Sequence, residues 1–277
     1  MRILATLLAV LATACLADEE IDTHADDGSL YEQAYEEGQA EGKTDGTDCS
    51  GVRIPDRNGF AKRIALTFDD GPNPATTPAV IEVLHEHHAP ATFFNNGVRY
   101  GTAGATQVAA QIAADPDFIL ANHSQNHLNL AQQSLDKVTS EVDRTDGLLR
   151  AAGETPKFFR FPFGSATCSY MKLVRSKGYI VTGWHIDSAD WCYAAGGGTC
   201  KKSTFKYVDD ALRDNMLGYI LAQAKSTGGG ILLMHDIHAN TAAHLDEILT
   251  ALEQHGFTFV RIDDIAAFPK LNAPPAP

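Results

Sequence analysis

From residue 63 onward, short apolar runs alternate with segments whose apolar residues recur at helical spacing. Such alternation favours a parallel sheet, because two neighbouring parallel strands need a crossover connection, which a helix usually supplies. About seven strand–helix repeats predict an α/β fold, a distorted (β/α) barrel with about seven parallel strands. The predicted strands are residues 64–68, 91–94, 118–121, 157–161, 179–184, 230–234 and 258–261.

Three of the helical segments also carry boundary signals. Capping residues followed by proline in the first turn, or by an amphipathic face, mark helix starts, and glycine marks helix ends. The predicted boundaries are Thr77 with Pro78 for the first helix, Ser134 and Gly153 for the second, and Thr241 and Gly256 for the third.

The N-terminus has the pattern of an export signal. Arg2 precedes an apolar run over residues 3–11, which is too short to span a bilayer, and small residues lead to Cys15. We expect residues 1–14 to be a signal peptide and the protein to be periplasmic or at the cell surface. Small residues before Cys15 also resemble a bacterial lipobox, although Ala12 stands where Leu is usual. Lipidation of Cys15 and cleavage without lipidation both remain open.

The formal charge of −13 is unevenly distributed. Residues 18–48 hold twelve carboxylates and one lysine, whereas the chain from Cys49 onward carries a net charge of only −3. We therefore expect residues 15–48 to be an acidic disordered tether. Residues 49–61 would lead into the folded domain, and residues 269–277 form a Pro/Ala-rich tail. The sequence contains no basic patch or stripe of the kind that would indicate nucleic-acid binding.

The five cysteines fit an oxidising compartment. If Cys15 is lipidated or removed, four remain, which is enough for two disulfides. Cys192 and Cys200 flank a glycine-rich stretch and are the expected local pair, which leaves Cys49 with Cys168. Zinc binding by these four is the alternative, although no Cys-x-x-Cys spacing occurs.

Polar residues follow almost every predicted strand. Residues 67–72 read Thr-Phe-Asp-Asp-Gly-Pro, and two adjacent carboxylates are costly to crowd unless they share a cation or a proton. By itself this could be a polar turn.

Residues 123–127 read His-Ser-Gln-Asn-His, a spacing that would place both imidazoles on one face of a helical turn, where they reach one metal ion. With one free aspartate they make a two-histidine, one-carboxylate set with open positions for water and substrate.

Three further segments follow later strands. Residues 160–164 read Arg-Phe-Pro-Phe-Gly, and their arginine could keep one aspartate ionised and oriented. Residues 187–191 read Asp-Ser-Ala-Asp-Trp, and residues 233–236 read Leu-Met-His-Asp, with His238 close behind.

These five segments, in this order, resemble the five motifs of the polysaccharide deacetylase family, also called the NodB-homology domain or carbohydrate esterase family 4. The family patterns are T-F-D-D-G, H-[ST]-x-x-H, R-x-P-[YF], D-x-x-D-W and L-x-H-D, and all five are complete here. The matching domain covers residues 62–268.

The resemblance implies a metal centre and a base. Asp70, His123 and His127 would bind a divalent metal, zinc first, with cobalt or nickel as alternatives. Asp69 would be the general base that activates water, and Arg160 would hold it in place.

The resemblance also implies an acid. His235 would protonate the leaving amine and would be tuned by an aspartate of the fourth motif. We expect Asp190 rather than Asp187 in that role.

Three residues are implied to contact the substrate. The backbone N–H of Phe163 would stabilise the oxyanion. Trp191 and Leu233 would line the groove around the sugar and the acetyl methyl group. Residues 192–205 form an apparent loop insertion, which would shape substrate choice if it packed over the groove.

The expected function is removal of N-acetyl groups from N-acetylglucosamine residues of a polysaccharide. Peptidoglycan is preferred over chitin oligomers, because a lipid anchor at Cys15 and the tether would hold the domain near the cell wall. An O-acetyl esterase acting on xylan or another glycan is one alternative, and an inactive sugar-binding protein is another. The oligomeric state is not predicted.

Overall fold

The computed structural model describes residues 59–273. Three predictions lie outside these residues: the signal peptide, the processing of Cys15 and the acidic tether. The predicted pairing of Cys49 with Cys168 also lies partly outside them, because Cys49 is not among the described residues. Within residues 59–273, no helix combines the length and the apolar character needed to cross a membrane.

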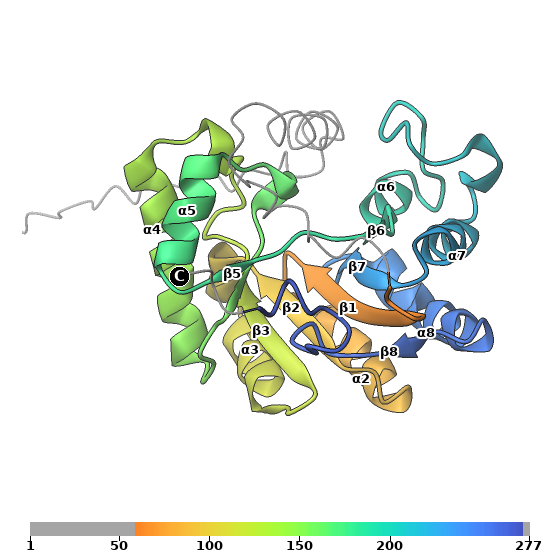
Figure 1. Cartoon of the computed structure of the whole chain (residues 1–277), viewed down its shortest axis with the longest axis horizontal. Helices are drawn as coiled ribbons and strands as arrows, with labels where there is room; N and C mark the ends of the chain where they lie inside the picture. Colours follow the sequence, from red (N-terminus) through yellow and green to blue (C-terminus); the bar gives the residue numbers. More distant parts are fainter. Residues whose placement is uncertain (1–58, 274–277) are drawn as a thin grey trace, which may run out of the picture.

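One sheet of eight strands organises the domain, with all its ladders parallel. Its order is β5-β4-β3-β2-β1-β7-β6, and β8 pairs with the start of β1 (Figure 1). The strands are β1 (Arg63–Asp69), β2 (Ala91–Asn95), β3 (Phe118–Asn122), β4 (Phe158–Phe159), β5 (Ile180–Val181), β6 (Ile186–Asp187), β7 (Gly230–His235) and β8 (Thr258–Phe259). The predicted α/β fold with a distorted parallel barrel is confirmed. Within the described chain no ladder joins β5 to β6, so the barrel is incomplete there.

The helices cover the sheet and supply its parallel crossovers (Figure 1). They are α2 (Thr77–Glu86), α3 (Ala105–Ala114), α4 (Leu135–Ala151), α5 (Cys168–Ser176), α6 (Asp190–Ala195), α7 (Met216–Thr227) and α8 (Ala239–Gln254). Helix α2 begins at Thr77, but its N-cap is Thr76, so the predicted cap at Thr77 is wrong by one residue. Ser134 caps α4 as predicted, by accepting a hydrogen bond from the backbone of Lys137 at 3.3 Å. The predicted start at Thr241 is wrong. Helix α8 begins two residues earlier, and Thr241 lies buried in its first turn.

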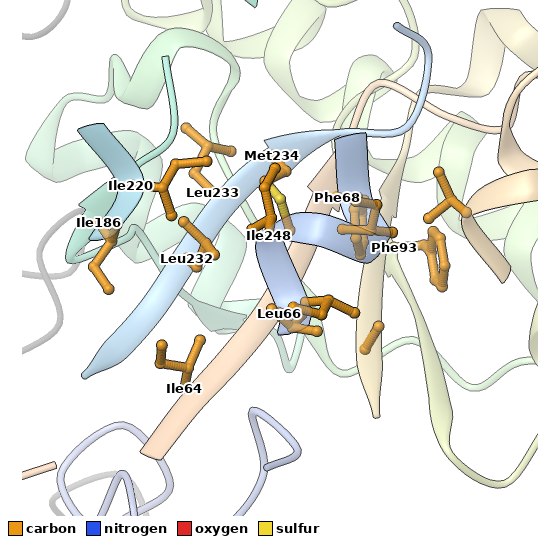
Figure 2. Close-up of a cluster of buried hydrophobic side chains, with 14 of the residues drawn as sticks. Ile64, Leu66, Phe68, Phe93, Ile186, Ile220, Leu232, Leu233, Met234 and Ile248 are labelled. Carbon is orange, nitrogen blue, oxygen red and sulfur yellow. The ribbon is translucent and has the colours of Figure 1, made fainter. Parts of the chain in front are cut away.

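The core lies between the central strands and their helices. Leu66 and Phe68 of β1 pack with Phe93 of β2, Met234 of β7 and Ile248 of α8 (Figure 2). Helices cover the faces of a parallel sheet, so its central strands are nearly continuous in apolar residues. Burying each such side chain contributes about 1.5–3 kcal/mol. This packing fixes the strand register, and with it the positions of the residues at the strand ends.

The register brings polar residues together at the carboxyl ends of the strands. Asp69 is the ladder partner of His235 on one side and of Phe94 on the other. Asn95 is paired with Asn122 in the next ladder. In (β/α) barrels the active site lies at this edge, which the carboxyl ends of the strands form.

Candidate active site

Three potential metal ligands meet at this edge. Asp70 follows β1, and His123 and His127 follow β3, with one ligand atom of each lying within 4.8 Å of the others. Asp70 Oδ1 is 3.3 Å from Nε2 of His127 and 3.5 Å from Nε2 of His123. Two imidazoles and one carboxylate fit a zinc-type site that keeps positions open for water and substrate.

The two histidines do not share a helical turn, so that part of the prediction is wrong. The segment is a bent loop in which Ser124 and His127 have φ of 70° and 52°. Its backbone carbonyls accept hydrogen bonds from Gly97 and Val98 of the neighbouring segment, which replace the bonds of a helix. The imidazoles converge because this loop folds back, and not because of helical spacing.

The protonation states of the histidines suit metal binding. His123 Nδ1 lies 2.8 Å from the backbone oxygen of Arg160, which can only accept a hydrogen bond, so its Nε2 is left for the metal. Burial lowers the pKa of both His123 and His127 to about 4. Both rings are therefore neutral at neutral pH, as metal ligands must be.

Asp70 is held in its ionised form. Burial alone would raise the pKa of this carboxyl, but the neighbouring histidines, His127 first, outweigh burial and hold the pKa well below its usual range. The side-chain amide of Asn96 donates a hydrogen bond to Asp70 Oδ1 at 2.8 Å. Asn96 was not among the predicted site residues, although its place at the end of β2, where polar residues collect, was a usable signal.

Asp69 is bonded to a fully buried arginine. Arg160 Nη1 lies 2.7 Å from Asp69 Oδ1 and 2.9 Å from Thr67 Oγ1, and Arg160 Nη2 donates to the carbonyl oxygen of Gly183 at 2.9 Å. Burial raises the pKa of Asp69 to about 6, and Arg160 opposes that rise. A carboxylate with this pKa can accept a proton near neutral pH.

His235 pairs with Asp190 rather than Asp187. Asp190 Oδ1 lies 2.8 Å from His235 Nδ1, and Asp190 Oδ2 accepts hydrogen bonds at 2.7 Å from the backbone N–H of His235 and from the hydroxyl of Thr241. Asp187 instead accepts a bond from the backbone of Ala189. Burial would lower the pKa of His235, but Asp190 outweighs it and raises the pKa to about 10. His235 is therefore protonated at neutral pH.

A glycine is required where the Asp69-Asp70 turn meets β7. A Cβ on Gly71 would collide with the carboxyl group of Asp236. That carboxyl accepts a hydrogen bond from Thr77, and the backbone oxygen of Asp236 accepts one from Thr76 at 2.5 Å. These contacts fix the turn that presents Asp70.

The three predicted substrate contacts lie close to this edge, and all three side chains are buried. The ring of Phe163 is 4.5 Å from that of His127, and Phe163 has φ of 59°. Trp191 is only 5% exposed and packs edge-on against Phe205, and Leu233 is 1% exposed. Trp191 and Leu233 thus belong to the core beside the site, and their contact with a sugar stays a prediction.

The predicted loop insertion is partly helical and is covalently closed. It begins within α6, and the predicted disulfide between Cys192 and Cys200 is confirmed, with a Cα–Cα distance of 4.9 Å. Arg213 donates hydrogen bonds to the backbone oxygens of Cys200, Phe205 and Val208. The segment from α6 to α7 extends outward from the sheet at the upper right of the view (Figure 1). Its Phe205 is buried against Trp191.

Known proteins share both the sequence pattern and the fold. The family model described as polysaccharide deacetylase matches residues 56–182. The peptidoglycan-N-acetylglucosamine deacetylase PgdA of Listeria monocytogenes is 32% identical over 78% of this chain, which spans 42% of that relative's length. A chitooligosaccharide deacetylase of Azorhizobium caulinodans is 29% identical over 70% of this chain and 90% of its own. The solved structure of the Bc1960 peptidoglycan N-acetylglucosamine deacetylase superposes with a TM-score of 0.61 at 27% identity, covering 74% of this chain and 89% of that one.

Proposed function

We propose that this chain, which belongs to the polysaccharide deacetylase family, is a metal-dependent hydrolase that removes N-acetyl groups from N-acetylglucosamine residues of a polysaccharide. One observation carries the proposal. The three-ligand set of Asp70, His123 and His127 lies beside a buried carboxylate, Asp69, and beside a protonated histidine, His235, paired with Asp190. Amide hydrolysis needs a base for water and an acid for the leaving amine, and both groups are present.

Each side chain then has one task. A divalent metal bound by the three ligands would supply a Lewis acid for the acetyl carbonyl. Asp69 takes a proton from the attacking water with the carboxylate oxygen that Arg160 does not occupy. His235 gives its Nε2 proton to the amine nitrogen as the C–N bond breaks, which releases acetate and the free amine. The backbone N–H of Phe163 would donate to the oxyanion of the tetrahedral intermediate.

The metal we propose is zinc. Two neutral imidazoles and one carboxylate form a donor set typical of catalytic zinc sites, and cobalt or nickel accept similar ligands. Metal analysis of protein purified without chelators, followed by reconstitution with each of the three ions, tests this assignment.

Peptidoglycan is the substrate we propose, acted on outside the cytoplasm. The support is the predicted signal peptide, the lipobox-like residues before Cys15 and the predicted acidic tether, together with the relative named for peptidoglycan. Residues 62–268 would form the catalytic domain, held near the cell wall by residues 15–48. The relative named for chitooligosaccharides keeps chitin oligomers as the second candidate.

One experiment separates the candidates. Acetate release is measured from peptidoglycan, chitin oligomers and acetylated xylan, with the Asp69→Asn variant as the control. We expect release from peptidoglycan by the zinc-loaded wild type only, with loss after chelation. Faster release from chitin oligomers would change the substrate, and release from xylan alone would identify an O-acetyl esterase. No release by the metal-loaded protein from any of the three would favour the inactive sugar-binding alternative.

A further inference from the structure

We propose that Thr241 is a positioning residue for His235, acting through the carboxylate of Asp190. The activity readouts rest on the proposed function, in which His235 is the general acid. The geometric part stands without it.

Asp190 accepts hydrogen bonds at both of its oxygens. Its Oδ1 accepts from His235 Nδ1 and from the backbone N–H of Trp191, both at 2.8 Å. Its Oδ2 accepts from the backbone N–H of His235 and from the Thr241 hydroxyl, both at 2.7 Å. Apart from His235, Thr241 provides the only side-chain donor among these contacts.

The hydroxyl of Thr241 is directed away from its own helix. A threonine in a helix often bonds the carbonyl oxygen three or four residues earlier. In α8 the Thr241 hydroxyl instead reaches Asp190, the first residue of α6. Thr241 and Asp190 are 0% and 1% exposed, so bulk water cannot replace this bond. The contact thus joins the first turns of two helices at the buried side of the acid.

Loss of the Thr241 hydroxyl should loosen the orientation of the Asp190 carboxylate and, through it, that of the His235 imidazole. Without the hydroxyl, Asp190 Oδ2 keeps only the backbone N–H of His235, and the carboxylate is freer to rotate about its terminal bond. Rotation moves Oδ1 away from Nδ1, so the imidazole loses the contact that fixes its orientation. His235 donates its proton in the step in which the C–N bond breaks, and not during substrate binding. A misoriented His235 should therefore lower kcat and leave KM unchanged.

The test compares three variants. Thr241→Val removes the hydroxyl while nearly keeping the shape, Thr241→Ser keeps the hydroxyl, and Thr92→Val is the matched control. Thr92 is 1% exposed, and its hydroxyl has no hydrogen-bond partner within the described chain. Since hydrogen bonds to charged groups are among the stronger ones, we expect kcat about tenfold lower in Thr241→Val. KM and metal content should be unchanged, and Thr241→Ser and Thr92→Val should keep kcat within about twofold of the wild type.

A second readout needs no turnover. In ¹⁵N-labelled protein, the Nδ1–H proton of His235, assigned with a His235→Asn variant, should exchange with solvent about tenfold faster in Thr241→Val than in the wild type or Thr241→Ser. Unchanged exchange in Thr241→Val overturns the proposal, whether or not the protein is an active deacetylase. Equal loss of kcat in Thr241→Val and Thr241→Ser would also overturn it, because the methyl group rather than the hydroxyl would then matter. Faster exchange in a protein without deacetylase activity would support the positioning role and reject the proposed function.

Discussion

The amide of Asn96 donates a hydrogen bond at 2.8 Å to Oδ1 of Asp70, the same carboxylate oxygen that lies 3.3 Å from His127 Nε2. Asn96 is 2% exposed, so this bond is shielded from solvent. Residues that hold a metal ligand in its orientation contribute to metal affinity without touching the metal.

Replacing Asn96 with Ala should therefore weaken zinc binding about 10- to 100-fold. Competition with a chromogenic chelator measures this without any substrate. The neighbouring Asn95→Ala is the matched control, because the Asn95 amide reaches the hydroxyl of Tyr100 at 3.4 Å instead of Asp70. Equal affinity in the Asn96→Ala variant and the wild type would contradict an outer-shell role.

The three ligands should act as a set. We expect His127→Ala to lose both bound metal and deacetylase activity, because two remaining donors leave a catalytic zinc site incomplete. The control is His244→Ala, since His244 lies on the exposed surface of α8 and, within residues 59–273, pairs with Glu247 alone. Metal analysis and acetate release are measured on the same samples. Full activity of exhaustively chelated wild type would show that the centre is not needed.

The acid and the base should be separable from metal binding. Asp69→Asn and His235→Ala should each lower kcat about 10²- to 10⁴-fold, because each removes one proton-transfer partner. Neither side chain belongs to the ligand set, so zinc content should stay close to that of the wild type. A rate near the wild-type rate in either variant would remove that residue from the mechanism.

The disulfide between Cys192 and Cys200 closes a short loop, with a sequence separation of 8. Cross-linking a loop of this length restricts the unfolded chain and contributes about 2–3 kcal/mol in the loop-entropy model. The Cys192→Ala/Cys200→Ala double variant should lose up to this amount in the free energy of unfolding. Urea titration under non-reducing conditions measures the difference. An unchanged midpoint and slope would mean that Arg213 and the core contacts hold the loop without the bond.

Stability should depend on pH through His87, which joins the end of α2 to α8. Its Nε2 lies 2.9 Å from Asp246 Oδ1, and its Nδ1 lies 3.1 Å from Glu253 Oε2. Burial lowers the pKa of His87, but the two carboxylates outweigh burial and raise it above its usual value. A raised folded-state pKa means that the stabilisation is full below the unfolded pKa and is lost as pH rises through the folded pKa.

Because both carboxylates are largely exposed, the contribution should be at most about 1 kcal/mol. Unfolding free energies of the wild type and of His87→Gln, measured at pH of about 5 and about 8, should differ more at the lower pH. The exposed His244→Gln serves as the control. A larger difference at the higher pH would contradict the sign.

Much of the fold could be predicted from local sequence. The seven apolar runs became strands, because alternation of buried strands with amphipathic helices is decided by short-range periodicity and by burial. The short strand β6 and helices α3, α5, α6 and α7 were not predicted. Helix α3, for example, begins at Ala105 after Gly104, which has a left-handed conformation and provides no side-chain cap, so none of the start signals used for the other helices was present.

Polar residues after the strands indicated one edge of the sheet as the site, because parallel strands bring their carboxyl ends to one edge. The individual candidate residues and their roles came from the resemblance to the five family motifs. Tertiary structure decided which of those residues meet. Asp190 rather than Asp187 reaches His235, and Trp191 is buried beside the site, where its contact with a sugar stays a prediction. Thr241 and Asn96 became part of the site through contacts between separate elements. Side-chain direction depends on positive φ angles, such as those of Ser124 and His127, and on packing between distant segments, and neither is encoded in local spacing.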